Sequence, residues 1–204
     1  MHIEEIFSGV TYQVWRLSDL KLLKTAYLDV GENRYSQISP EEARRAPDGS
    51  VLVQTLGCGL ERITGVDTDQ PTSKLVYTFP GNWCGVPTVV GHYLVQGVLG
   101  IHGLIVLDIA NAAKPVEVSR LVISDSYHPH WTGWGAKTQR IVVDSGHPPE
   151  DRLYLLKLDA TTGSITLDDA FRDVDGKIGF SFASRDWPHG WTGVAEPHGA
   201  VFSR

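Results

Sequence analysis

Histidines in short segments rich in proline, glycine and tryptophan are the residues of this sequence with the clearest potential for chemistry. Eight histidines occur among the 204 residues. Four of them are candidate ligands of one metal ion: His128, His130, His189 and His198. Neutral imidazoles suit copper, zinc, iron and nickel, and a metal with an open coordination position supports Lewis-acid or redox chemistry. The alternative is structural, with each ring hydrogen-bonded to the backbone of a neighbouring repeat. The spacing leaves both interpretations open.

The two cysteines are the other side chains that could bind a metal. A single pair, Cys58 and Cys84, cannot form a framework of disulfides, and it lacks the spacing of a zinc ribbon. Cys84 directly precedes an expected strand, so it is either a thiolate ligand for a soft metal or, more commonly for free cysteine, a buried side chain. The sequence has no nucleophile elbow, no phosphate-binding glycine loop and no His-Glu-x-x-His. It therefore assigns no catalytic residue.

A repeat organises the elements that must position these residues. Four times, an aliphatic or β-branched stretch ends in an aspartate and a polar turn, and a second extended run follows; the aspartates are Asp19, Asp67, Asp108 and Asp159. Short strands that repeat every 40–50 residues or so are typical of propeller blades. A catalytic residue has no reason to recur in every unit. We therefore expect these aspartates to cap turns by accepting backbone amides.

The predicted fold is an all-β propeller in a single domain, residues 1–204. The expected units are 11–30, 39–79, 84–123 and 127–173, and residues 197–203 resemble the first strand of a further unit. One count is about four blades, if that last strand completes the N-terminal blade and so removes exposed sheet edges. The other is the C-terminal part of a larger propeller. The one stretch with helical character is Pro40–Arg45, which is long enough for a single turn.

A propeller predicts where the histidines lie, because the inner strands of all blades converge on one channel. Proline donates no ladder hydrogen bond and so marks the first residue of a strand. Pro129 and Pro197 each precede a histidine at such a position. His130 and His198 are therefore expected near each other at one end of the channel, with the remaining two candidate ligands beside them. A small-molecule ligand in the central channel is expected as well.

Composition excludes several classes of partner. The formal net charge is −6 and the isoelectric point is about 5.7, whereas a nucleic-acid-binding protein would carry a basic stripe. No run approaches the roughly 18–20 apolar residues that a transmembrane helix needs. The first five residues include two acids where a signal peptide has basic residues before an apolar stretch. The sequence thus predicts a soluble protein without a signal peptide or a transmembrane segment.

Several segments resemble a known family. The run Gly103–Ile109 followed by Lys114–Val118 resembles the LVIVD-type blade repeat. The segments 12–15 with 22–25, 140–167 and 196–198 are similar to blades of the selenium-binding protein family. The resemblance implies a propeller from a family that includes copper-dependent methanethiol oxidases, with channel histidines as metal ligands. Copper or another transition metal and oxidase-type chemistry are the expectations that follow from it. Members of that family are about twice this length, and their histidine- and cysteine-bearing N-terminal half has no counterpart here.

Two other functions fit a propeller. One is a non-enzymatic binding or scaffold protein, which would need no metal. The other is a lactonase-type hydrolase, which would hold a divalent metal through carboxylates and asparagine. The expected channel positions carry histidine rather than acidic residues, so the lactonase ranks third.

Overall fold

The computed structural model describes residues 2–5, 9–29, 39–68, 70–146, 151–183 and 185–203. These residues form strands and turns, and the one helical segment among them is the short 3-10 helix η2, Leu99–Ile101. The predicted all-β class is confirmed. Among the described residues, no helix has the length and apolar character needed to cross a membrane.

The strands form four consecutive antiparallel sheets, which we number along the chain. Sheet 1 contains β1 (His2–Glu5), β2 (Thr11–Arg16) and β3 (Lys21–Tyr27). Sheet 2 contains β4 (Pro40–Arg45), β5 (Val51–Thr55), β6 (Gly59–Thr64) and β7 (Thr72–Thr78). Sheet 3 contains β8 (Thr88–Val90), β9 (Tyr93–Val98), β10 (Gly103–Asp108) and β11 (Val116–Val122). Sheet 4 contains β12 (Pro129–Gly135), β13 (Arg140–Ser145), β14 (Arg152–Leu158) and β15 (Ile165–Leu167). Each sheet is a meander in which neighbours in sequence are neighbours in space.

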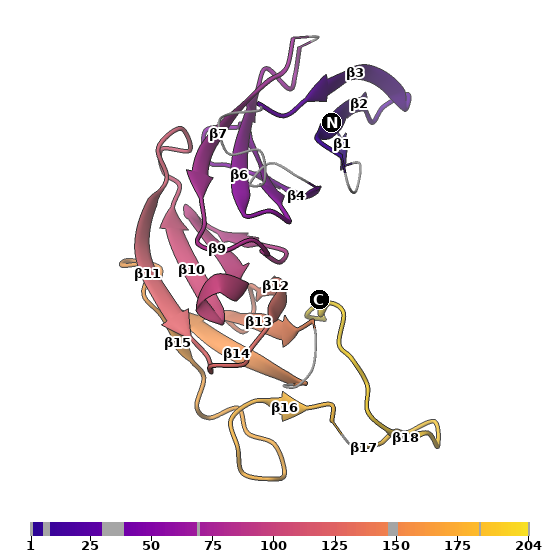
Figure 1. Ribbon diagram of the computed structural model, residues 1–204, viewed down its shortest axis with the longest axis vertical. Coiled ribbons are helices and arrows are strands. Elements are labelled where there is room, and N and C mark those ends of the chain that lie inside the picture. The colour runs from indigo at the N-terminus through magenta and orange to yellow at the C-terminus, as the bar shows by residue number, and fades with distance from the viewer. Residues whose placement is uncertain are drawn as a thin grey trace.

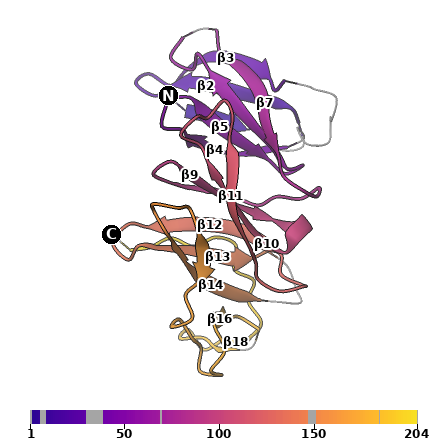
Figure 2. The same ribbon diagram turned by 90° about the vertical axis from the view of Figure 1, so that its left-hand side faces the viewer.

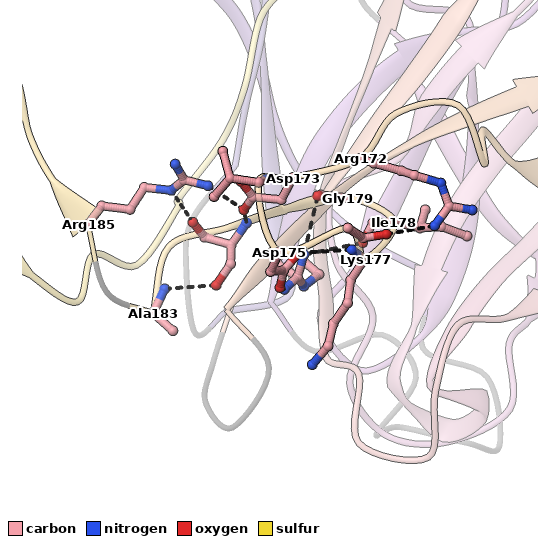
Figure 3. Close-up of polar contacts among 12 residues, drawn as sticks. Arg172, Asp173, Asp175, Lys177, Ile178, Gly179, Ala183 and Arg185 are labelled. Atoms are coloured by element: carbon pink, nitrogen blue, oxygen red, sulfur yellow. Dashed lines mark hydrogen bonds and ion pairs between the residues drawn. The ribbon is translucent and has the colours of Figure 1, made fainter.

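Three short strands follow sheet 4. β16 (Phe180–Ser181) pairs with β14, and β17 (Arg185–Asp186) forms a hairpin with β18 (Thr192–Gly193). Figure 3 shows the polar contacts that hold this extension: Asp173 accepts the backbone N–H of Ser181 at 2.8 Å and forms an ion pair with Arg185. The Arg185 guanidinium lies 3.5 Å from the ring centroid of Phe180, a cation–π contact. Side chains, more than strand pairing, therefore fix the extension.

The four sheets follow one another along an open arc (Figure 1). Sheet 1 lies at one end and β16–β18 at the other, while β4, β12 and the C-terminal segment lie on the concave side. Figure 2 also places the C-terminus beside β12. The closure in which a C-terminal strand completes the N-terminal blade is not seen, because sheet 1 in the described chain pairs only β1, β2 and β3. The structure thus shows a series of blade-like sheets, and a propeller closed into a ring stays a prediction.

The core lies between the sheets rather than within one layer. One cluster joins sheets 1 and 2 through Tyr12, Val14, Val53 and Ile63. A second joins sheets 2 and 3, and a third joins sheets 3 and 4. Fully burying one aliphatic side chain stabilises a fold by about 1.5–3 kcal/mol. Each sheet therefore depends on its neighbours for stability, as blades do.

Two expectations about local structure are wrong. Pro40–Arg45 is the strand β4, paired with β5 from Pro40↔Thr55 to Arg45↔Val51, and not a helical turn. Pairing within the sheet overrides the weak helical preference of two glutamates and an alanine. Cys84 is fully buried, which was one of the two alternatives, but it is not a free thiol: it forms a disulfide with Cys58 across 26 residues, and the described chain has no free cysteine. The start of sheet 3 runs beside the end of β5, where the Cys84 N–H donates to the Leu56 carbonyl at 3.0 Å, and so the two cysteines meet.

Candidate functional site

A pocket of about 250 Å³ opens where β4, the segment before β8, β12 and the C-terminal segment come together. Its lining residues are Pro40, Glu41, Glu42, Val86, His130, Trp131 and His198. Parallel backbone contacts bring these segments side by side: Val86 N–H donates to the His130 carbonyl at 2.6 Å, and Thr132 N–H donates to the Val86 carbonyl at 3.1 Å. Three of the segments that line the pocket, β4, β12 and the C-terminal segment, lie on the concave side of the arc in Figure 1.

His130 and His198 meet at this pocket. Their ring centroids are 4.4 Å apart, with the ring planes inclined by 49°. Each follows a buried proline, Pro129 or Pro197. The His130 side chain is 15% exposed, whereas His198 is exposed to solvent. The structure thus gives the proximity of the two rings that the sequence predicts, while metal binding by them stays a prediction.

Asp144 of β13 lies directly behind the two histidines. It is fully buried. One carboxylate oxygen accepts the backbone N–H of Trp131 at 2.9 Å, and the other accepts the backbone N–H of Gly199 at 2.7 Å. The first of these oxygens is 3.8 Å from His130 Nδ1. Burial raises the pKa of Asp144, and the two amide donors and His198 act in the opposite direction.

Glu41 of β4 supplies a second carboxyl group to the pocket. Burial raises the pKa of Glu41, against the opposing effects of a hydrogen bond from Gln54 and of His198 nearby. The neighbouring Glu42 forms an ion pair with Arg44 at 2.6 Å, and its negative charge also raises the pKa of Glu41. Two imidazoles flanked by two carboxyl groups can bind a cation, or they can accept and return a proton.

The other two predicted ligands lie elsewhere. The His128 ring stacks on His102, with ring centroids 6.1 Å apart, and His102 Nδ1 is 3.1 Å from the Tyr127 carbonyl oxygen. His189 is exposed in the turn that joins β17 to β18. Within the described ranges, no group of three or more His, Cys, Asp or Glu side chains is arranged to hold a metal ion. Of the four histidines, the pocket therefore contains two.

The sequence analysis missed Asp144, Glu41 and Trp83, whose ring stacks on His130 with centroids 5.7 Å apart. A signal for Asp144 was present. The second strands of sheets 2, 3 and 4 read Val-Leu-Val-Gln-Thr, Tyr-Leu-Val-Gln-Gly and Ile-Val-Val-Asp-Ser. A polar residue interrupts an apolar strand at the same position each time, and in sheet 4 that residue is Asp144.

Comparisons with known proteins show similarity at the level of fold. No protein-family model and no curated protein sequence matches the chain. Among solved structures, a hypothetical selenium-binding protein from Sulfolobus tokodaii matches with a TM-score of 0.62 and 14% identity, over 79% of this chain and 46% of its own. A putative 6-phosphogluconolactonase from Bacteroides uniformis matches with a TM-score of 0.65 and 12% identity, over 92% of this chain and 58% of its own. A periplasmic gluconolactonase from Pseudomonas aeruginosa matches with a TM-score of 0.55 and 12% identity, over 81% and 53%.

These likenesses define the architecture and leave the activity open. At 12–14% identity they show a shared all-β arrangement of antiparallel sheets, with a selenium-binding protein and propeller-like lactonases among the neighbours. The chain spans about half the length of the solved structures it matches. The LVIVD repeat stays a prediction, since no family model supports it.

Proposed function

We propose that this chain is a propeller-type protein whose concave pocket binds copper, or another first-row transition metal, through His130 and His198. The metal would supply the oxidase-type chemistry that the resemblance to selenium-binding proteins implies. The observation behind the proposal is the 4.4 Å separation of two imidazole rings that are far apart in sequence. Imidazole nitrogens bind such metals at about 2.0–2.1 Å.

The residues present suit part of a metal centre. Two imidazoles meet at the mouth of an open pocket, and one of them lies beside a buried carboxylate. A carboxylate behind a metal-binding histidine commonly orients the ring and raises its basicity. Glu41 lines the same pocket, but it is not arranged with the two histidines as a third ligand. Two protein ligands leave coordination positions for water or a small molecule, which catalytic centres need.

Metal content and affinity test this proposal. We expect the purified protein to bind one copper or similar ion per chain, and we expect the affinity to fall at least about tenfold in His130→Ala and in His198→Ala. His189→Ala is the matched control, because that histidine is exposed in a distant turn. Elemental analysis by mass spectrometry and a competition titration with a chelator would measure both. Equal affinity in wild type, His198→Ala and His189→Ala would contradict the proposal.

A second candidate is hydrolysis of a sugar lactone. It is favoured by the names of two structural neighbours, a putative 6-phosphogluconolactonase and a gluconolactonase. The raised pKa of Glu41 beside an imidazole also suits a general acid and base. An imidazole would take a proton from water as the oxygen attacks the lactone carbonyl. The ring C–O bond would break, and the leaving oxygen would receive a proton from the Glu41 carboxyl group.

The two candidates separate in a direct assay. Release of acid from gluconolactone and from 6-phosphogluconolactone would be followed above the spontaneous rate, with and without a chelator. The lactonase candidate predicts turnover that falls about a hundredfold in Glu41→Gln. If neither metal binding nor turnover is found, the non-enzymatic scaffold is the function that remains.

A further inference from the structure

We propose that Asp144 is the positioning residue of the pocket. By accepting one backbone N–H from each of two chain segments, it holds the loop that bears His198 against the strand that bears His130. The positioning itself stands on geometry alone. Its effect on metal affinity rests on the proposed function, and the experiment below keeps the two apart.

The two amides that Asp144 binds occupy equivalent positions. Trp131 directly follows His130, and Gly199 directly follows His198. The N–H groups of both reach Asp144, one to each carboxylate oxygen, at 2.9 and 2.7 Å. One rigid carboxylate therefore fixes the residue next to each histidine, and so fixes the relative placement of the two rings.

Because Asp144 is buried, its carboxylate needs both of these hydrogen-bond donors. Asp144 has no exposed surface and lies on a strand whose neighbouring residues Ile141–Val143 are buried aliphatic side chains. A buried carboxylate is unfavourable unless its oxygens accept hydrogen bonds. Bonds to an ionised acceptor are also shorter and stronger than neutral ones. Loss of the Gly199 donor would leave a buried oxygen without that partner, so the docked position of the C-terminal segment is strongly favoured.

The equivalent residues of the preceding sheets act in the opposite sense. Gln54 donates its amide N–H to the carbonyls of Thr55 and Cys84 at 2.8 and 2.7 Å. Gln96 donates to the carbonyls of Gly85 and Gly97. In sheets 2 and 3 this position therefore presents a donor to neighbouring backbone, whereas in sheet 4 it presents two acceptors. The change from glutamine to aspartate coincides with the pocket.

The C-terminal segment has few other attachments of this kind. In the described chain, residues 194–203 contain no strand. The segment instead packs on β12 at two glycines. A Cβ atom on Gly133 would lie 2.9 Å from the Ala200 carbonyl oxygen, and one on Gly135 would lie 2.7 Å from the Phe202 ring. These contacts allow close approach. Hydrogen bonds fix the register of the segment: the Ala195 N–H donates to the Phe182 carbonyl at 2.9 Å, and the Gly199 N–H donates to Asp144 beside His198.

The test compares Asp144→Asn with a matched control, Asp168→Asn. Asparagine keeps the size of the side chain and one acceptor, but it turns an NH₂ group toward one of the two amides. We expect amide hydrogen exchange at Gly199 and its neighbours to become at least about tenfold faster, and copper affinity to fall by about 10–100-fold. Asp168→Asn makes the same change at another buried carboxylate, which lies directly after β15 and pairs with Arg140 and Lys157. It should lower the melting temperature while leaving exchange at Gly199 and copper affinity unchanged.

Each outcome has a distinct meaning. If Asp144→Asn lowers the melting temperature as Asp168→Asn does, with Gly199 exchange unaltered, Asp144 is only a core residue and the proposal is wrong. If Gly199 exchange rises while neither Asp144→Asn nor His198→Ala affects copper, the positioning is correct and the metal site is not. If Asp144→Asn does not fold, amide exchange in the wild-type protein tests the proposal instead. Slow exchange at Gly199, comparable to that at Trp131, supports the proposal, and exchange at the rate of an open chain overturns it.

Discussion

Single carboxylates stabilise the turns of the repeat. The Asp108 carboxylate accepts the Ala110 N–H at 2.8 Å, and Asp159 accepts the N–H groups of Thr161 and Thr162 at 2.8 and 2.9 Å. Asp19 makes a longer bond of the same kind, to the Lys21 N–H at 3.4 Å. Each side chain binds backbone two or three residues ahead, which is the geometry of an Asx turn. The predicted structural role is therefore confirmed for these three aspartates.

Asp108→Ala should lower the free energy of unfolding by about 1–2 kcal/mol, because the turn between β10 and β11 loses its cap. Ligand or metal binding at the pocket should hardly change. Asp108→Asn, which keeps an acceptor oxygen, is the control and should lose less stability. Urea unfolding followed by fluorescence would measure all three proteins. Loss of binding without loss of stability would show that the aspartate has a role in the site instead.

The elements show which sequence signals are sufficient. The aliphatic runs at 93–98, 104–109 and 140–144 lie within one or two residues of the strands β9, β10 and β13, which are buried on both faces. The run at 153–158 lies within β14, where burial alternates along the strand. The pairing of His130 with His198 was also predictable, because proline marks both segments. The strand Pro40–Arg45 could not be predicted in this way. Its sequence is mostly charged rather than apolar, and its extended conformation depends on pairing with β5.

Contacts between sheets leave a weaker signal in the sequence. Asp144 lies in an apolar strand, and its function depends on a segment 55 residues away. The disulfide joins the β5–β6 turn to the start of sheet 3, so its two cysteines belong to different repeats. Neither relation has a local pattern of residue types. The disulfide depends on how sheet 2 packs on sheet 3, and the Asp144 contact depends on how the C-terminal segment packs on sheet 4. A single sequence specifies both only through the whole fold.

The disulfide should contribute to the joint between sheets 2 and 3. A bridge that closes a 26-residue separation stabilises a fold by about 3–4 kcal/mol through loss of entropy in the unfolded chain. The double variant Cys58→Ala/Cys84→Ala should lose about that amount in urea unfolding. Treatment with a reductant should destabilise the wild type to a similar extent and leave the variant unchanged, which makes the variant its own control. If the reductant frees both thiols of the wild type but leaves its free energy of unfolding the same as before treatment, the bridge contributes little.

At the scale of the whole molecule, the joint between sheets 1 and 2 contains a buried carboxyl group. Glu61 of β6 has no exposed surface and lies in β6 directly opposite Val53 of the apolar cluster that joins the two sheets. Among the residues that the structure describes, neither of its oxygens has a hydrogen-bond partner, and the same holds for the hydroxyl of Tyr12. Burial, together with the negative charge of Asp29, raises the pKa of Glu61 to about 8. The protonated form of Glu61 is therefore the form that is compatible with close packing of sheet 1 on sheet 2.

A raised pKa means that the folded protein holds this proton more tightly than the unfolded chain does. The stability linked to Glu61 should be complete below about pH 4.5, should decrease as pH rises toward 8, and should then level off. The shift corresponds to roughly 3–5 kcal/mol over that window. Carboxyl groups with lowered pKa values, such as Asp168, act in the opposite direction but only at more acidic pH.

Glu61→Gln removes the titration while keeping the shape of the side chain. We expect the difference in melting temperature between this variant and the wild type to grow steadily from pH 5 to pH 8, with the variant the more stable at the alkaline end. Hydrogen exchange should locate the effect, since ionisation of Glu61 weakens the contact with sheet 1 before it affects the disulfide-linked sheets 2 and 3. Asp169→Asn, in the exposed turn that follows β15, is the control and should show no such trend. A constant difference between Glu61→Gln and wild type across this range would mean that Glu61 is already ionised in the folded protein and that sheet 1 is held independently of pH.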